Sequence, residues 1–370
     1  MKNTDSKANQ INQISQQQLS LLVKKARKKY KIPAIVVMLI NSKEIYLQEF
    51  DGVRVANQPK NITLNDYFHI GSCSKSVLAV IAAKLIEQNK ITWQTKFFDV
   101  FFELRPIADK AYSDITLQDL FLCEAGIQAY TDSKIDVFPE YGSSVNNKRF
   151  EFIKKLITQP PASEFNGKNS KFGHLYSNAS YTMASAMLER VAGLNYEQLV
   201  KKAMNNDLDF AVLIGWPNNF NADQPWGHTI AKGKIELFPP DHPYKLPFLI
   251  TPAGDLSMKP VDYAKYTQLH LRGLRGEDNY ISSESYRFIH FGRTGFSIGV
   301  GNGVMSGIKF SGLDGSAGTF YCRSIIVPES DFAFTIMMNA GSGTASMKAV
   351  EWLTMQIVKR YYNWQWKFWM

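Results

Sequence analysis

The sequence has few of the residues from which metal sites and disulfide frameworks are built. It contains three cysteines, Cys73, Cys123 and Cys322, which are odd in number and far apart along the chain. Such a set predicts neither a disulfide framework nor a zinc cluster. The six histidines include no His-Glu-x-x-His motif and form no pattern with the cysteines. We therefore expect no metal site.

The motifs of two large enzyme classes are also missing. The chain has no Gly-x-Ser-x-Gly sequence, which argues against the nucleophile elbow of α/β-hydrolases. It has no Gly-rich phosphate loop of the Walker type either. Gly301-Asn302-Gly303 is the nearest candidate, and we interpret it as a hairpin turn.

The N-terminal region lacks the apolar segment of a secretory signal. Its first thirty residues are rich in Asn, Gln and Lys. The longest early apolar run, from Ile35 to Ile40, is too short to span a bilayer. These features predict a cytoplasmic protein, or a periplasmic or secreted one if a leader was removed before residue 1.

Much of the net charge of +9 lies in one short segment, where six basic residues crowd the stretch from Lys24 to Lys31. Apolar residues recur beside them at helical spacing, which predicts an amphipathic helix with a basic outer face. Such a face is either simply solvated or makes weak contact with an anionic membrane surface. The aromatic tail, residues 363–370, carries three Trp that either anchor at a membrane interface or pack on the protein. We expect no nucleic-acid partner.

The order of predicted elements indicates the fold. Residues 1–18 are polar and are expected to be disordered. Residues 19–362 are expected to form a single domain, because 370 residues with 45% hydrophobic composition can bury a large core. Strand patterns occur near both ends, in about 19–65 and 285–362, and helical patterns fill about 66–284. This order predicts an α+β fold: an antiparallel sheet flanked by helices, with an inserted all-helical lobe and a cleft between the lobes.

The expected strands combine β-branched residues with turn signals at their ends. They are Ala34–Ile40, Glu44–Phe50, Phe296–Val304, Met305–Ser311, Thr319–Val327 and Phe332–Asn339. The expected helices show apolar residues at helical spacing. They run from Ser72 to about Gln88, Leu117 to Leu122, Phe150 to Ile157, Ser180 to Ala192 and about Thr344 to Tyr362.

A Ser-x-x-Lys sequence occurs twice, at Ser72–Lys75 and at Ser306–Lys309. The second lies in a predicted strand, where positions i and i+3 face opposite sides. The first begins a predicted helix, where these positions are neighbours, so Lys75 can approach the Ser72 hydroxyl. A serine hydroxyl becomes a good nucleophile only when a neighbouring group activates it. Without a partner motif, Ser72 could equally be a helix N-cap.

Two further segments are candidate partners. Tyr176-Ser177-Asn178 precedes a helix, and Phe310-Ser311-Gly312 ends a late strand and is followed by Leu313. Taken together and in this order, the three segments resemble the motifs of serine β-lactamases and penicillin-binding proteins. The Tyr-x-Asn form is similar to the class C β-lactamase branch, which includes D-alanyl-D-alanine carboxypeptidases and esterases. Thr251-Pro252-Ala253-Gly254 also resembles a segment of this group, and the resemblance covers roughly residues 20–360.

The resemblance implies a role for each matching residue. Ser72 would be the acylated nucleophile, Lys75 the cation beside it and Tyr176 the general base that later protonates the leaving group. Asn178 would bind the substrate amide or orient Lys75. The backbone N–H groups of Ser72 and Leu313 would form the oxyanion hole. Such chemistry needs no cofactor.

One departure concerns Phe310, which stands where the group usually has Lys or His. Phe310, Ser311 and Gly312 would line the substrate cleft, so this departure predicts neutral substrates rather than carboxylate-bearing ones. The function implied is a serine hydrolase that cleaves an amide or ester of a small molecule or peptide through an acyl-enzyme on Ser72. The alternative is a catalytically impaired penicillin-binding or sensor protein of the same fold.

Overall fold

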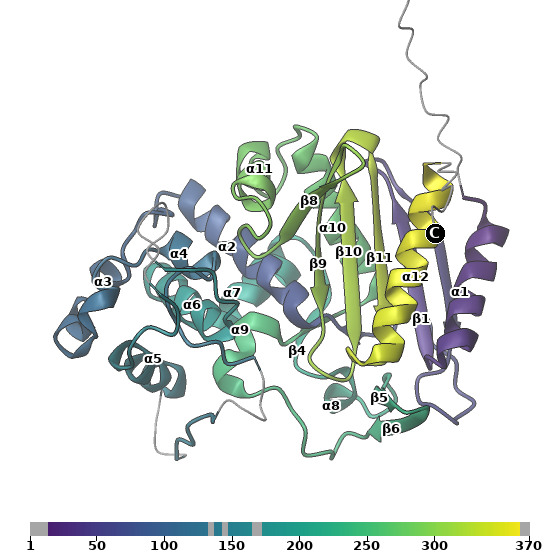
Figure 1. Cartoon of the computed structure of the whole chain (residues 1–370), viewed down its shortest axis with the longest axis horizontal. Coiled ribbons are helices and arrows are strands. Elements are labelled where there is room, and N and C mark those ends of the chain that lie inside the picture. Colours follow the sequence, from purple (N-terminus) through teal and green to yellow (C-terminus); the bar gives the residue numbers. More distant parts are fainter. Residues whose placement is uncertain (1–13, 132–136, 143–146, 165–171, 363–370) are drawn as a thin grey trace, which may run out of the picture.

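The computed structural model describes residues 14–131, 137–142, 147–164 and 172–362. Its centre is a six-stranded sheet in the order β2-β1-β11-β10-β9-β8, with every neighbouring pair antiparallel (Figure 1). The strands are β1 (Ala34–Ile40), β2 (Ile45–Gly52), β8 (Gly301–Met305), β9 (Ile308–Gly315), β10 (Tyr321–Val327) and β11 (Phe332–Met338). The first hairpin of the chain therefore pairs with its last strands, as the sequence predicted.

The β8–β9 hairpin differs from the prediction in its register. Its turn lies at Ser306 and Gly307, both with positive φ, and not at Gly301–Gly303, which belongs to β8. Strand β9 consequently continues beyond Ser311 to Gly315. This shift matters for the site, because it changes which residues stand at the end of the strand.

Strand β1 explains why both faces of the sheet are covered. All seven of its residues are buried, and alternate side chains of a strand point to opposite faces. Ile35, Val37 and Leu39 pack into the core under the terminal helices. Val36 and Met38 pack into the larger core on the other side. The uninterrupted apolar run is therefore the pattern of a strand between two cores.

The terminal helices α1 (Gln16–Tyr30) and α12 (Thr344–Tyr361) cover one face of the sheet (Figure 1). A capping box at Ser15 begins α1, so the disorder expected for residues 1–18 does not extend to residues 14–18. The basic side chains of α1 lie on its exposed side, as predicted, and Arg27 pairs with Asp51. The aromatic tail lies outside the described residues.

The opposite face of the sheet is covered by α10 (Pro260–Leu274), which packs on β1, β10 and β11. The sequence assigned this segment to the helical lobe, whereas its contacts join α10 to the sheet. Its buried face includes Tyr263, Ala264 and Leu271, which join the larger core.

The remaining helices form the region beside the sheet (Figure 1). They are α2 (Ser74–Glu87), α3 (Phe97–Val100), α4 (Leu117–Phe121), α5 (Lys148–Thr158), α6 (Asn178–Ala192), α7 (Tyr196–Val200), α8 (Pro217–Phe220), α9 (Thr251–Gly254) and α11 (Ser283–Phe291). Helix α2 is almost entirely buried, because it lies inside the larger core. No helix among the described residues is both long and apolar enough to cross a membrane.

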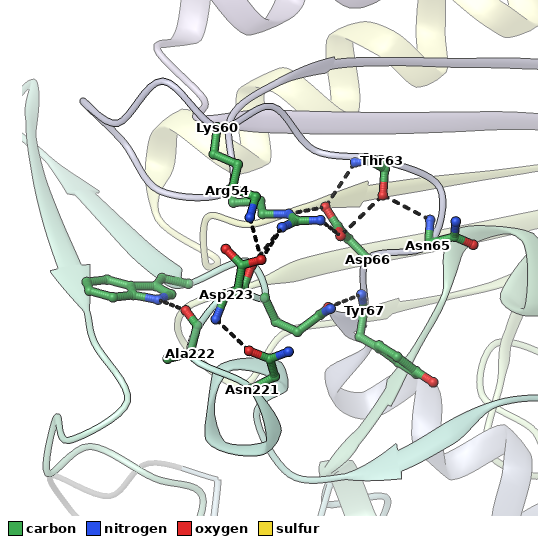
Figure 2. Close-up of polar contacts among 11 residues, drawn as sticks. Arg54, Lys60, Thr63, Asn65, Asp66, Tyr67, Asn221, Ala222 and Asp223 are labelled. Carbon is green, nitrogen blue, oxygen red and sulfur yellow. Dashed lines mark hydrogen bonds and ion pairs between the residues drawn. The ribbon is translucent and has the colours of Figure 1, made fainter.

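Two small sheets complete the fold. One contains β3 (Phe68–His69), β7 (Leu256–Met258) and β4 (Val212–Ile214), and the other is the hairpin of β5 (Gly227–Ala231) and β6 (Lys234–Phe238). An ion-pair network ties the segment after β2 to the segment between α8 and β5 (Figure 2). In this network Arg54 binds Asp66, at 2.6 Å, and Asp223, at 3.0 Å. Lys60 also pairs with Asp223.

Candidate active site

Ser72 lies in a short 3-10 turn, Gly71–Cys73, directly before α2. Gly71 adopts a left-handed conformation with φ of 53°. Its N–H donates to Nδ1 of His69 at 3.1 Å, and Nε2 of His69 lies 3.0 Å from Asp255. Because Nδ1 accepts, Nε2 carries the ring proton and donates to the carboxylate. The buried His69 side chain thereby fixes the turn that presents the Ser72 hydroxyl.

Lys75 lies one turn further along α2 and is completely buried. Its Nζ is 3.2 Å from Ser72 Oγ, 2.8 Å from Asn178 Oδ1 and 2.7 Å from the carbonyl oxygen of Ala253. The side chain therefore reaches Ser72 as the helical spacing predicted. Burial lowers the pKa of Lys75 to about 7, because an ammonium group loses its hydration there.

Tyr176 and Asn178 flank the start of α6. Ser177 between them is the N-cap, and its hydroxyl accepts from Ser180 N at 2.9 Å. Tyr176 OH donates to Ser72 Oγ at 2.9 Å, while Asn178 Nδ2 donates to the carbonyl of Tyr130 at 2.9 Å. Burial raises the pKa of Tyr176, so its hydroxyl keeps its proton in this arrangement. The structure thus brings together Ser72, Lys75, Tyr176 and Asn178.

The third segment, Phe310-Ser311-Gly312, does not lie beside Ser72 in the same cavity. The Ser311 side chain is buried and binds His290 Nδ1 at 2.6 Å and the carbonyl of Gly301 at 3.0 Å. Phe310 faces the other side of the sheet, toward the core under the terminal helices. Phe310, Ser311, Gly312 and Leu313 do not line the cavity that contains Ser72. Phe310, Gly312 and Leu313 line instead a neighbouring groove that also includes Tyr176.

The end of β9 approaches Ser72 three residues later, at Gly315 and Ser316. A Cβ on Gly315 would lie 1.9 Å from the carbonyl oxygen of Ile70, and one on Gly71 would lie 2.4 Å from Ser316 N. Only glycine permits so close an approach of two backbones. The glycines of the run Gly315-Ser316-Ala317-Gly318 could have indicated this close approach, but the sequence analysis ended the strand at Ser311.

Two spaces lie near the nucleophile, one lined by Ser72 and the other by its hydrogen-bond partner Tyr176. A cavity of about 440 Å³ contains Ser72 and Asn178. Sequence reasoning missed several of its other lining residues, which include Tyr130, Tyr244, Lys245, Ser316 and Gly318. A groove of about 600 Å³ begins at Tyr176 and runs along β8, β9 and β10 to α12. Its lining is mainly apolar and includes Phe296, Met305, Ile308, Phe310 and Ile325.

Comparison with known proteins identifies the family to which this chain belongs. The family model described as Beta-lactamase matches residues 19–359. The chain belongs to the beta-lactamase family. Among curated proteins, the unguisins hydrolase ungD of Aspergillus violaceofuscus is 22% identical over 185 residues, which are 49% of this chain and 31% of that relative. The chain therefore matches less than a third of that protein's length.

Several solved structures have a similar fold. An octameric penicillin-binding protein homologue from Pyrococcus abyssi has a TM-score of 0.71 and 19% identity, covering 92% of this chain and 77% of that one. A class C beta lactamase from Rhodobacter sphaeroides has a TM-score of 0.68 and 15% identity, covering 92% of this chain and 99% of that one. FmtA from Staphylococcus aureus has a TM-score of 0.71 and 16% identity, covering 96% of this chain and 93% of that one. The fold is therefore that of beta-lactamases and penicillin-binding proteins, and family membership supports a hydrolase-like function.

Proposed function

We propose that this protein is a serine hydrolase that cleaves an amide or ester through an acyl-enzyme on Ser72. The observation that carries the proposal is the position of Ser72 Oγ, which lies 3.2 Å from Lys75 Nζ and 2.9 Å from Tyr176 OH. A nucleophile within hydrogen-bond reach of both a base and an acid is the arrangement that covalent catalysis needs. The hydrolase and beta-lactamase named among the relatives support hydrolysis as the reaction type.

The order of the two pKa values favours Lys75 as the base. Its pKa of about 7 leaves a large neutral fraction near neutral pH, whereas the raised pKa of Tyr176 keeps that hydroxyl protonated. Lys75 would accept the Ser72 proton as Oγ attacks the substrate carbonyl carbon. This differs from the sequence-based role of Tyr176 as the base, and it leaves Tyr176 as the proton donor.

The later steps follow from the same geometry. The bond from the carbonyl carbon to the leaving group breaks, and the leaving group takes the proton of Tyr176. Lys75 returns the proton to the Tyr176 oxygen, since its Nζ and the tyrosine hydroxyl both lie within hydrogen-bond distance of Ser72 Oγ, at 3.2 Å and 2.9 Å. Water then attacks the acyl carbon and gives a proton to neutral Lys75. The bond from that carbon to Ser72 Oγ breaks, Oγ takes the proton from Lys75, and the acid product is released. Backbone N–H groups of Ser72 and Ser316 are the candidate oxyanion donors, because both residues line the cavity.

The test is labelling with a fluorophosphonate probe, followed by turnover of an excess of p-nitrophenyl ester. We expect labelling and turnover in the wild type and neither with Ser72→Ala. Ser306→Ala is the matched control, because Ser306 belongs to the other Ser-x-x-Lys sequence and lies in the β8–β9 turn. Labelling without turnover would support the alternative, an impaired penicillin-binding or sensor protein. Equal labelling of wild type and Ser72→Ala would refute the proposal.

A further inference from the structure

Among the described residues that line the Ser72 cavity, Lys245 has the only charged side chain. The polar groups around it are neutral hydroxyl and amide groups, such as those of Thr131, Asn178 and Ser316. Lys75 adds a second amine beside the nucleophile, but its Nζ is already used by three acceptors. An anionic substrate group in this cavity would therefore meet one cation and no carboxylate of the described lining.

The contacts of Lys245 leave part of its hydrogen-bonding capacity unused. Its Nζ donates to Asn219 Oδ1 at 3.0 Å and to the carbonyl of Pro240 at 3.1 Å. Both acceptors are neutral, and an ammonium group has three N–H donors. No carboxylate of the described chain lies within ion-pair distance, although the charge of Asp241 acts on it from further away. Partial burial lowers the pKa of Lys245, which is the sign of an incompletely compensated cation.

The surrounding segments hold Lys245 in place. Tyr244 OH donates to the carbonyl of Ala317 at 2.9 Å, which joins the Lys245 loop to the turn after β9. On the other side, Asn219 belongs to α8, whose Asn218 donates to the carbonyl of Phe238 at 2.8 Å. The segment after α8 is bound by the Arg54 network (Figure 2). The ammonium group is therefore positioned before any ligand arrives, which reduces the entropic cost of binding.

The two spaces at the nucleophile correspond to the two parts of a substrate. Tyr176, the proposed proton donor to the leaving group, lines the apolar groove and not the cavity. A leaving group that receives its proton would lie on the groove side, and the acyl part would lie in the cavity with Lys245. We propose that Lys245 binds a carboxylate carried by the acyl part of the substrate, an inference that rests on the proposed function of Ser72.

This inference replaces the expectation of neutral substrates. That expectation depended on Phe310 standing in the cleft, whereas Phe310 lines the groove. In this inference the carboxylate binds to Lys245. This lysine lies in the loop between β6 and α9, where the sequence shows no motif.

The experiment compares two p-nitrophenyl esters of equal shape, (4-carboxyphenyl)acetate and (4-carbamoylphenyl)acetate. The readout is the ratio of their kcat/KM values, so effects common to both substrates cancel. We expect the wild type to favour the carboxylate, and Lys245→Met to lower the ratio by about ten- to a hundredfold, the range for one charge-assisted hydrogen bond. Lys245→Arg should retain most of the preference. Lys234→Met on β6, which removes an exposed lysine outside the cavity, should leave the ratio unchanged.

Each outcome separates this inference from the proposed function. If both esters are hydrolysed through Ser72 and the ratio is the same in wild type and Lys245→Met, the role of Lys245 is refuted while the hydrolase proposal stands. If neither ester is hydrolysed and Ser72 is not labelled, the proposed function itself fails. If Lys245→Met does not fold, as judged by circular dichroism, Lys245→Gln is measured in its place with the same expected fall in the ratio.

Discussion

The Ser72 cavity and the groove beyond Tyr176 differ in character, although a hydrogen bond joins the Ser72 and Tyr176 hydroxyls that line them. The cavity lining mixes hydroxyl and amide groups and one ammonium with apolar residues such as Leu246 and Ile250. The groove lining is mainly aromatic and aliphatic, apart from the Asp314–Arg323 ion pair. A polar site discriminates strongly between partners with and without a matching group, because an unmatched buried polar group is costly. An apolar surface discriminates weakly and by size. The difference suggests that the cavity sets the selectivity for the acyl part.

The largest expected effect tests whether Tyr176 belongs to the groove side. Tyr176→Phe removes the proton donor, so we expect alkyl esters and amides to lose about 10²–10⁴-fold in kcat/KM. A p-nitrophenyl ester should lose much less, because p-nitrophenolate leaves as an anion. The measurement is kcat/KM for an ethyl and a p-nitrophenyl ester of the same acid. Equal losses for the two leaving groups would mean that Tyr176 acts on Ser72 rather than on the leaving group.

The next effect concerns Lys75, whose Nζ lies 3.2 Å from Ser72 Oγ. With a pKa of about 7, Lys75 gains the neutral, proton-accepting form as pH rises. We therefore expect kcat/KM to rise about tenfold per pH unit below 7 and to level off above it, because only the neutral amine can act as the base. The check is a pH–rate profile from pH 5 to 9 with a substrate that does not titrate in this range. A fall in rate above pH 7 would instead make the ammonium form the active one.

Much of this arrangement could be predicted from local patterns. Ser72, Lys75, Tyr176 and Asn178 each stand at a helix start, where spacing and caps determine which side chains meet. The strand end was less predictable, because the register of a hairpin depends on its turn. The turn lies at Ser306 and Gly307, and β9 continues to Gly315 rather than ending at Ser311.

Lys245 illustrates what the sequence could not supply. It lies in an irregular loop, and its position depends on hydrogen bonds with Asn219 and Pro240 and on the contact of Tyr244 with Ala317. None of these contacts has a periodic signature. The packing of α10 on the sheet was missed for a similar reason, because its apolar stripe fits a helical lobe as well as a sheet face.

A smaller effect is expected for the groove. Leaving alcohols from ethanol to hexanol should raise kcat/KM by about twofold per methylene, roughly half of the value for complete burial, because the groove is open on one side. Phe310→Ala should weaken this dependence, and Phe50→Ala on β2, an exposed aromatic outside the groove, should not. Phe310→His should also leave the carboxylate preference unchanged. A shift toward carboxylates in that variant would bring Phe310 back into the acyl site.

The smallest effects compare one tyrosine hydroxyl from each space. Tyr244 OH donates to the carbonyl of Ala317 at the cavity, and Tyr362 OH donates to Ser330 Oγ at the groove. Each Tyr→Phe change removes a hydrogen bond between neutral groups, so we expect either variant to lose about 1 kcal/mol of stability in denaturant unfolding. Only Tyr244→Phe should also reduce the carboxylate-to-carbamoyl ratio, by about two- to threefold, because it loosens the loop that carries Lys245. If Tyr362→Phe changed the ratio equally, the two spaces would be coupled, and the division of the substrate between them would not hold.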